Sequence, residues 1–245
     1  MTDLNLSALA PMVDKLARRS PLGPAETDAL LNLPYRIARL DARAYLVREG
    51  DRVDSCVALL SGFACRSKIA GGGARQILSV HMRGDVLDLQ NGLLDRVDHN
   101  AQALTRVEAA YIPIRAVLDA AEAHPAIARA LWRDTVVDGS IFREWILNVG
   151  RRNARQRISH LICELALRQE ECDVRQGPLY EWPLTQEHVA DATGLTPVHV
   201  NRTLQGMRAD GLIATTRDTI TIVDWSALQA AGDFRRDYLH LPPAT

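Results

Sequence analysis

The side chains with the most informative chemistry lie in one short stretch near the C-terminal end of the chain. If a helix begins at Pro197, its apolar residues are spaced four and three apart on one face: Val200, Leu204 and Met207. The opposite face then carries Pro197, Val198, Asn201 and Arg202. An arginine guanidinium donates two hydrogen bonds to guanine O6 and N7, and an asparagine amide pairs with adenine. The predicted chemistry is therefore recognition of base edges in duplex DNA.

A tight turn between two short helices must position these side chains. The first helix opens at Thr185 and Gln186 and ends at Gly194, since glycine takes positive φ without strain. Thr196 supplies a side-chain oxygen to free backbone N–H groups, and Pro197 suits the first helical position because it lacks an N–H. This arrangement is typical of a helix-turn-helix, whose second helix enters the major groove.

The segment after this helix, "LIATTRDTITIVD", alternates apolar and polar residues about Arg217 and Asp218. Such alternation predicts a two-stranded hairpin, or wing. The alternative is a helical hairpin of an ordinary globular domain in which Arg202 is merely solvated. Gly194, Thr196, Pro197 and the hairpin, all in register with Arg202, disfavour that alternative.

Composition bounds the whole molecule. The 245 residues suffice for one large or two medium domains, and 47% hydrophobic with 24% charged residues is typical of soluble globular proteins. The N-terminal segment is amphipathic and carries acids, so it does not read as a secretory signal. Four scattered cysteines without a C-x-x-C motif favour a reduced, cytoplasmic protein. A net charge of −1 argues against an unspecific nucleic-acid coat, although residues 196–209 hold His199, Arg202 and Arg208 without an acid.

The chain divides into helical and strand-rich parts. Residues 1–34 are predicted to be helical, and residues 35–112 read as short strands separated by glycine turns, which favours a β-sandwich or barrel. Helical patterns return at Pro113. A long helix is predicted from Pro125 to about Val149, followed by a basic hinge at Arg151–Arg155 and a further helix over about 154–168.

The long helix carries a repeat with spacings of four and three, which resembles a coiled-coil seam. Its members are Leu131, Thr135, Asp138, Phe142, Trp145 and Val149. Val136, Val137 and Ile141 give a second apolar face. We expect the seam to pack on a partner helix, because a helix-turn-helix usually acts as a two-fold pair. The alternative is a helix buried between two domains of a monomer.

Taken together, these motifs resemble the Crp/Fnr family of bacterial transcription regulators over nearly the whole chain. "REGDRVDSCVALLSGFACR" is similar to its second and third barrel strands, and "MRGDVLDLQNGLL" to the start of its effector cassette. "TQEHVADATGLTPVHVNRTLQGMRADGLI" is similar to its winged helix. The resemblance implies an α+β fold: a cyclic-nucleotide-binding-like β-barrel, or jelly roll, at residues 1–122, a dimerisation helix and hinge at 123–152, and a winged helix-turn-helix DNA-binding domain at 153–245.

The resemblance also implies roles and partners. Base contacts are expected from Thr196, Pro197, Val198, Asn201 and Arg202. Phosphate contacts are expected from Thr185 and Gln186 at the start of the first helix and from Arg217 of the wing. His199 and Arg208 are expected to contact phosphates as well. The expected partners are a second copy of the chain, double-stranded DNA with a palindromic site, and RNA polymerase if the protein activates transcription. No membrane association is expected.

The effector cassette departs from the family pattern. Members that bind cyclic AMP have Gly-Glu, and then Arg followed by Ser or Thr and Ala. Here Gly84-Asp85 and His99-Asn100-Ala101 occupy these places, so the pocket expected at Gly84, Asp85, Asn100 and Ala101 lacks the arginine. An anionic phosphate needs a cation or several N–H donors. We therefore do not expect cyclic AMP binding, although Arg96 or Arg106 could substitute.

The sequence also bears on other cofactors and functions. No cysteine precedes Cys56, so an iron–sulfur cluster is not expected. A haem-responsive regulator, through His81 or His99, and a redox-responsive one, through Cys172, remain alternatives, as does a signalling scaffold that does not bind DNA. No metal site is predicted. The sequence has no G-x-S-x-G, Walker or H-E-x-x-H motif, and the Asp95, Asp98 and His99 cluster reads as a solvated loop. The prediction is a homodimeric, cytoplasmic, sequence-specific DNA-binding transcription regulator, not an enzyme.

Overall fold

The computed structural model describes residues 7–94, 96–171 and 178–241. They form two compact units. The first contains the described residues up to Arg66 together with Val80–Asp138, and the second contains Ser67–Ser79 and Gly139–Leu241. No helix among these residues is long and apolar enough to cross a membrane.

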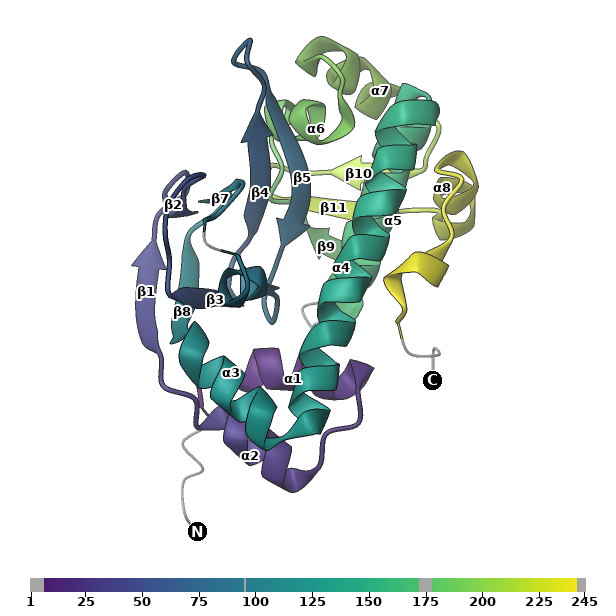
Figure 1. Ribbon diagram of the computed structural model, residues 1–245. Coiled ribbons are helices and arrows are strands. Elements are labelled where there is room, and N and C mark those ends of the chain that lie inside the picture. Colours follow the sequence, from purple (N-terminus) through teal and green to yellow (C-terminus); the bar gives the residue numbers. More distant parts are fainter. Residues whose placement is uncertain (1–6, 95, 172–177, 242–245) are drawn as a thin grey trace. The chain divides into compact units, whose positions relative to one another are not determined.

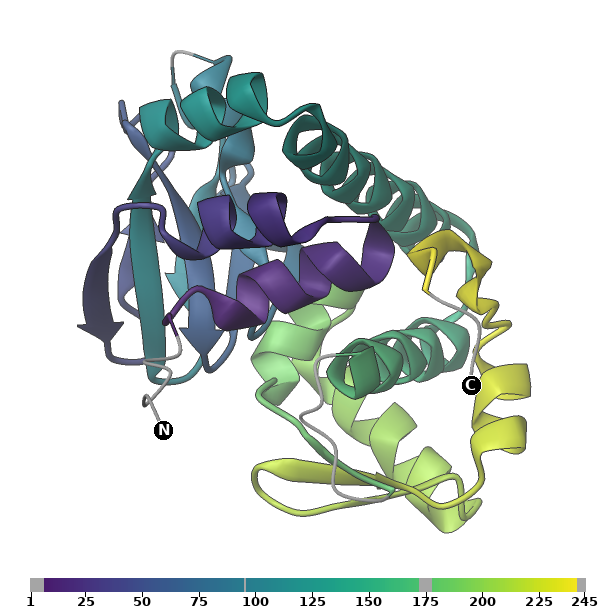
Figure 2. The same cartoon turned by 90° about the horizontal axis from the view of Figure 1, so that it is seen from below.

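Two short helices open the first unit, α1 (Ala10–Arg19) and α2 (Pro24–Leu31), and they lie side by side (Figures 1 and 2). Each has a proline in its first turn, where the missing N–H has no intrahelical partner to lose. Apolar residues of both helices pack into one core cluster with strand residues Ala58 and Ile112. The predicted helical N-terminal part is thus confirmed over these ranges.

Eight strands follow and form two four-stranded sheets. The first sheet has the order β1 (Arg36–Leu40), β8 (Val107–Pro113), β3 (Ser55–Ser61) and β6 (Val86–Leu87). The second has the order β2 (Tyr45–Val47), β7 (Asn100–Ala103), β4 (Ala64–Ile69) and β5 (Arg75–His81). One apolar cluster contains residues of both sheets, such as Val57 and Leu59 with Val47 and Ala101. The predicted β-sandwich or barrel is confirmed.

Gly84 shows why a glycine is required between two of these strands. It has a φ of +87°, and a Cβ built there would lie 2.9 Å from the carbonyl oxygen of Pro11. Both the backbone conformation and the close approach of α1 therefore exclude a side chain. The next residues lead into β6 and the short 3₁₀ helix η1 (Leu89–Gly92).

The first unit continues into α3 (Ile114–Ala123) and α4 (Pro125–Arg151). The long helix was predicted to run from Pro125 to about Val149, in agreement with α4. Three ion pairs hold the first part of α4 within this unit. Asp134 contacts Lys15 and Arg19 at 3.2 Å each, and Asp138 contacts Arg66 at 3.3 Å.

The seam predicted on α4 stays a prediction, although several of its side chains contact their own chain in the described residues. Leu131 packs on the core cluster of α1 and α2, and Asp138 takes part in the Arg66 ion pair. Trp145 is only 7% exposed, and its Nε1 donates to both carboxylate oxygens of Glu164 at 3.0 and 3.1 Å. These contacts leave Trp145 no surface to offer to a partner chain.

Four large apolar residues of α4 are exposed, and three of them lie one position after a residue of the predicted seam. They are Trp132, Val136, Ile146 and Leu147, with exposed fractions of 72%, 51%, 69% and 44%. Val136 and Ile146 are nearly three helical turns apart, so they share a side of the helix. We call these four residues the outer stripe of α4. Val137 and Ile141, predicted as a second apolar face, are buried.

The second unit is built around α5 (Ala154–Glu171), whose buried residues include Ile158, Leu161, Ile162 and Leu165. Three further helices pack on it: α6 (Gln186–Thr193), α7 (Pro197–Ala209) and α8 (Trp225–Ala231). Figure 2 shows α5 with these helices around it. A three-stranded sheet has the order β10 (Ile213–Thr215), β11 (Thr219–Ile222) and β9 (Leu179–Glu181), and the 3₁₀ helix η2 (Arg236–Leu239) ends the described chain.

Candidate nucleic-acid interface

Local hydrogen bonds fix both ends of α6. The Oγ1 atom of Thr185 accepts from the backbone N–H of His188 at 3.2 Å, which caps the helix at its start. Gly194 ends the helix in the left-handed conformation, with a φ of +65°. An Arg157 guanidinium nitrogen donates to the carbonyl oxygen of Thr193 at 2.7 Å. The turn into the next helix is therefore anchored to α5.

The same kind of cap starts α7. Thr196 accepts from the backbone N–H of His199 at 3.3 Å, and Pro197 is the first helical residue, both as predicted. The free N–H groups of this first turn give the end of the helix a partial positive charge. Such a terminus is well suited to lie close to DNA phosphates.

The two faces of α7 separate as the spacing predicts. Val200, Leu204 and Met207 are buried, and Val200 and Met207 have no exposed surface. Thr196, Pro197, Val198 and Arg202 are exposed, and Asn201 is half-buried. Val198 is 80% exposed. The five residues predicted to contact bases thus lie together around the first turns of α7.

The wing follows directly. Strands β10 and β11 pair antiparallel, Thr215 opposite Ile220, and Arg217 and Asp218 are exposed at the turn between them. Arg208, near the end of α7, donates to Oγ1 of Thr215 at 3.0 Å. This bond ties α7 to the wing. It also places the Arg208 guanidinium on the exposed surface with Arg217, both predicted to contact phosphates. Thr185 and Gln186 are exposed at the start of α6, and His199 is half-buried.

The four residues predicted to form an effector pocket have structural roles instead. Asp85 is buried and accepts from Nζ of Lys15 at 2.8 Å and from the backbone N–H of Met82 at 3.0 Å. Asn100 accepts from the backbone N–H of Glu49, and Ala101 lies in the core between the sheets. Of the two cavities described below, neither includes Gly84, Asp85, Asn100 or Ala101.

The two histidines considered as haem ligands are engaged with carboxylates. His99 is buried, with Nδ1 at 2.8 Å from Asp98 and Nε2 at 2.9 Å from Asp88. His81 is buried beside Asp85, at 3.5 Å. Burial and the nearby Arg66 charge lower the pKa of His81 despite that carboxylate. Haem ligation through His99 would require one of its two hydrogen bonds to break.

Sequence reasoning missed a buried polar cluster in the first unit. Arg66 of β4 lies 3.6 Å from Asp88 and 3.3 Å from Asp138, and Asp88 also binds His99. An arginine at a buried strand position is the only local signal, since its acidic partners lie far along the chain. The suggested substitutes for the missing arginine lie elsewhere: Arg96 donates to the Gly50 carbonyl, and Arg106 pairs with Asp41.

The cysteines that the structure describes are not placed for redox chemistry. Cys56, Cys65 and Cys163 are buried free thiols, and burial raises the pKa of Cys56 and of Cys163 to about 12. Such thiols are protonated and shielded, and hence unreactive. Cys172, the predicted redox candidate, and Asp95 of the polar loop lie outside the described residues.

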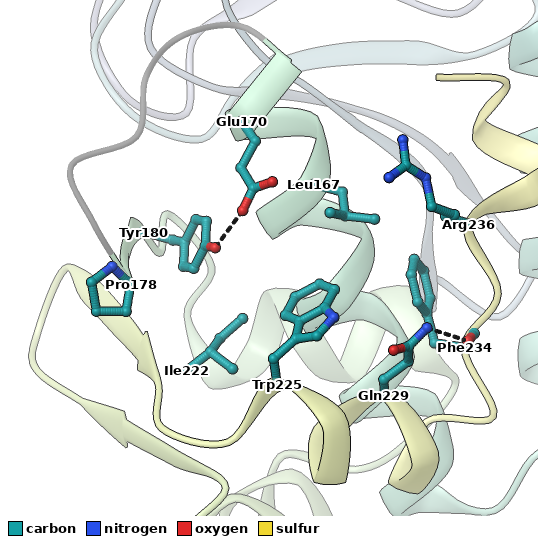
Figure 3. Close-up of a pocket in the computed structure, with 9 residues that line it drawn as sticks. All are labelled: Leu167, Glu170, Pro178, Tyr180, Ile222, Trp225, Gln229, Phe234 and Arg236. Atoms are coloured by element: carbon teal, nitrogen blue, oxygen red, sulfur yellow. Dashed lines mark hydrogen bonds between the residues drawn. The ribbon is translucent and has the colours of Figure 1, made fainter. Parts of the chain in front are cut away.

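A cavity of about 310 Å³ lies in the second unit between α5, β11 and α8 (Figure 3). Trp225, Phe234 and Ile222 form much of its wall. The hydroxyl of Tyr180 donates to Glu170 at 2.7 Å, and the Gln229 amide donates to the Phe234 carbonyl. These polar groups satisfy one another, so the cavity by itself indicates no ligand.

Comparison with known proteins gives two family models that match separate parts of the chain. A model of the cyclic nucleotide-binding domain matches residues 37–124, and a model of the Crp-like helix-turn-helix domain matches residues 156–231. The transcriptional activator protein FnrL of Cereibacter sphaeroides is 26% identical over 193 residues, 77% of each chain. The nitrogen fixation regulation protein FixK of Azorhizobium caulinodans is 25% identical, over 84% of this chain and 82% of its own.

Solved structures share the fold. FixK2 from Bradyrhizobium japonicum superimposes with a TM-score of 0.74 at 20% identity, covering 81% of this chain and 98% of its own. A CooA mutant from Carboxydothermus hydrogenoformans gives a TM-score of 0.65 at 16% identity, covering 95% and 97%. The two family models, the two relatives and the solved structures all agree with the winged helix of the second unit. The chain belongs to the Crp/Fnr family of DNA-binding transcription regulators.

Proposed function

We propose that the protein reads a palindromic DNA site as a homodimer, with the first turns of α7 in the major groove. The observation that supports this most directly is the exposed group of Thr196, Pro197, Val198 and Arg202 at the capped start of α7. The exposed side chain of Val198 can contact a thymine methyl. Arg202 provides the fork for guanine, and Asn201 can pair with adenine.

The residues around this surface supply the positioning contacts. Thr185 and Gln186 at the start of α6, His199 and Arg208 of α7, and Arg217 at the tip of the wing contact phosphates. Such contacts set the register of a protein on the duplex without reading its sequence. Because the chain has a net charge of −1, non-specific affinity is weak, and binding depends on this local charge.

The dimer forms through the outer stripe of α4. Trp132, Val136, Ile146 and Leu147 are large apolar side chains left in solvent on one helix, and a second copy of α4 would cover them. This replaces the predicted seam of Thr135, Asp138, Trp145 and its neighbours by a stripe that lies mostly one residue further along. The three-part organisation, with α4 as the dimerisation element, is retained in this proposal.

Regulation proceeds without cyclic AMP. Arg66, a buried cation of the first unit, is already engaged by Asp88 and Asp138, and the predicted cassette offers no arginine in its place. If the protein activates transcription, RNA polymerase is a further partner, acting at a protein already bound to its site.

Selection of genomic fragments by the purified protein tests the function. We expect a defined set of fragments that share one palindromic sequence, and Arg202→Ala should lose this enrichment. The matched control is Arg235→Ala, which removes an equally exposed arginine that pairs only with Asp237 in the described chain. Recovery of no fragment above background would favour the signalling-scaffold alternative, and equal loss in both variants would mean that charge alone drives binding.

A further inference from the structure

A second cavity, of about 200 Å³, lies in the first unit beside strands β1, β2, β3 and β8. Val47 and Val57 are buried in its wall, Tyr111 is half-buried, and Arg36 and Arg52 are exposed at its rim. Asp88 also lines it, although this residue is only 1% exposed. The cavity therefore joins a buried acid, an apolar wall and two exposed cations.

Only one of the two carboxylate oxygens of Asp88 has a partner within the described chain. Oδ1 of Asp88 lies 2.9 Å from Nε2 of His99 and 3.6 Å from Nη2 of Arg66. Oδ2 is buried and has no hydrogen-bond partner in the described part of the chain. Burial would raise the pKa of this carboxyl, but the His99 hydrogen bond and the Arg66 charge outweigh burial and hold the pKa below its ordinary value. A buried ionised oxygen without a donor is rare in folded proteins, so a donor from outside the chain is expected.

The rim is built for an anion. The guanidinium of Arg36 lies 4.8 Å from the centre of the Tyr111 ring, which orients it at the cavity. The Tyr111 hydroxyl donates to the Leu46 carbonyl at 3.3 Å, which fixes the ring as a wall. Neither Arg36 nor Arg52 forms an ion pair with any residue that the structure describes. The one acid at the rim, Asp54, accepts from the hydroxyl of Ser55 at 2.8 Å.

We propose that this cavity binds a small amphoteric molecule. An amino or other N–H group of the ligand donates to Oδ2 of Asp88, and its carboxylate or phosphate lies between Arg36 and Arg52. The volume is below the ~300–1,000 Å³ of pockets for drug-sized ligands, which favours a molecule of about ten non-hydrogen atoms. The inference rests on the first unit alone and does not depend on the proposed DNA contacts.

Isothermal titration calorimetry of the full-length protein tests the proposal with three matched probes. These are 4-(aminomethyl)benzoate, which has both charged ends, benzylamine, which has the amine alone, and 4-methylbenzoate, which has the carboxylate alone. The two-ended probe should bind about ten-fold more tightly than either single-ended one, since each charged end adds a charge-assisted hydrogen bond.

Variants separate the two ends. Arg36→Ala and Arg52→Ala should weaken the binding of 4-(aminomethyl)benzoate and 4-methylbenzoate but leave the binding of benzylamine unchanged. Asp88→Asn should instead weaken the binding of benzylamine and leave that of 4-methylbenzoate unchanged. Asp88 is buried and bonded to His99, so Asp88→Asn could unfold the unit. Val53→Trp is the second variant: it fills the cavity from a half-buried wall position and should abolish binding of all three probes while thermal melting stays cooperative. No binding of any probe, or binding that survives Val53→Trp, would overturn the proposal and assign the spare oxygen to water.

Discussion

Arg202 carries the sequence discrimination that we propose. It is exposed on α7, six residues after the cap at Thr196, and no residue that the structure describes forms an ion pair or hydrogen bond with its side chain. Arg202→Ala should weaken specific binding by about 1–3 kcal/mol and relax the preference at one base pair of each half-site. Titration of a set of site variants with both proteins measures this. Unchanged affinity together with unchanged base preference would remove Arg202 from the list of base contacts.

Single residues were predictable where their role is local. Gly194, Thr196 and Pro197 each act within one turn of their own position, so residue type and spacing suffice to predict the turn and the cap. Asp88 shows the opposite case. Its partners Arg66 and His99 come from β4 and the segment before β7, and only the folded sheets bring them together. The lining of the 200 Å³ cavity was unpredictable for the same reason.

At the scale of elements, α4 was predicted correctly as a helix, but its spacing alone does not decide which face meets a partner. Spacings of four and three fit two adjacent registers on this helix, and both contain apolar residues. The choice depends on what α4 packs against: Trp145 donates a hydrogen bond to Glu164 of α5, and Asp138 forms an ion pair with Arg66. These tertiary partners cannot be read from the period of the helix itself.

The outer stripe yields a test of dimerisation. Ile146→Glu places a charge in the outer stripe and should convert the dimer to monomer at low micromolar concentration, because an unpaired charge is costly in an interface. The fold of each chain should be unaffected, since Ile146 is 69% exposed. Sedimentation velocity and circular dichroism measure the two properties. A dimer that persists in Ile146→Glu would place the interface elsewhere.

The neighbouring residue is the matched control. Trp145→Glu brings a carboxylate against Glu164 in a buried site and should lower the free energy of unfolding by roughly 3–5 kcal/mol. The expected result is thus a destabilised chain rather than a folded monomer. If Trp145→Glu were instead stable and monomeric, the original seam would be the correct one.

The packing of α5 against the C-terminal segment predicts a dependence on pH. His160 is 1% exposed, and its ring stacks on Tyr238 at 5.6 Å and meets Phe234 edge-on at 5.0 Å. Burial, and then the charge of Arg152, lower the pKa of His160 from 6.5 to about 3. Between these two values the unfolded chain binds a proton that the folded chain does not, so stability falls as the solution is acidified through this window.

Comparison with a variant isolates this term. His160→Phe keeps an aromatic ring between Phe234 and Tyr238 but removes the titrating group. The wild type should lose up to about 1.4 kcal/mol more than the variant for each pH unit below 6. Urea unfolding at pH 7 and pH 5 measures the difference. An equal loss in both proteins would show that His160 does not titrate in this range.

At the scale of the whole molecule, the order of parts was readable because each part has its own period. Short alternating runs with glycine turns gave the two sheets, and the change to a period near four at Pro113 and Pro125 gave α3 and α4. The pairing order β1-β8-β3-β6 and β2-β7-β4-β5 could not be derived, since it joins strands from opposite ends of the unit. The resemblance to a known family implied the barrel but no pairing order.

The last prediction concerns the response of the intact dimer to cyclic AMP. The negative charge of Asp85 is paired with Lys15, and Lys15 in turn contacts Asp134. The buried cations near this region are engaged: Lys15 and Arg19 contact Asp134, and Arg66 is held by Asp88 and Asp138. Freeing Arg66 would take this cation away from both carboxylates, which is costly.

We therefore expect that cyclic AMP binds no more tightly than linear AMP and leaves DNA affinity unchanged within a factor of about two, because the predicted cassette at Gly84, Asp85, Asn100 and Ala101 offers neither nucleotide an arginine. Calorimetry with both nucleotides, beside a DNA-binding titration with and without cyclic AMP, measures this. Micromolar binding of cyclic AMP by the wild type, with a clear gain in DNA affinity, would mean that Arg66 or another arginine releases its carboxylates for the phosphate.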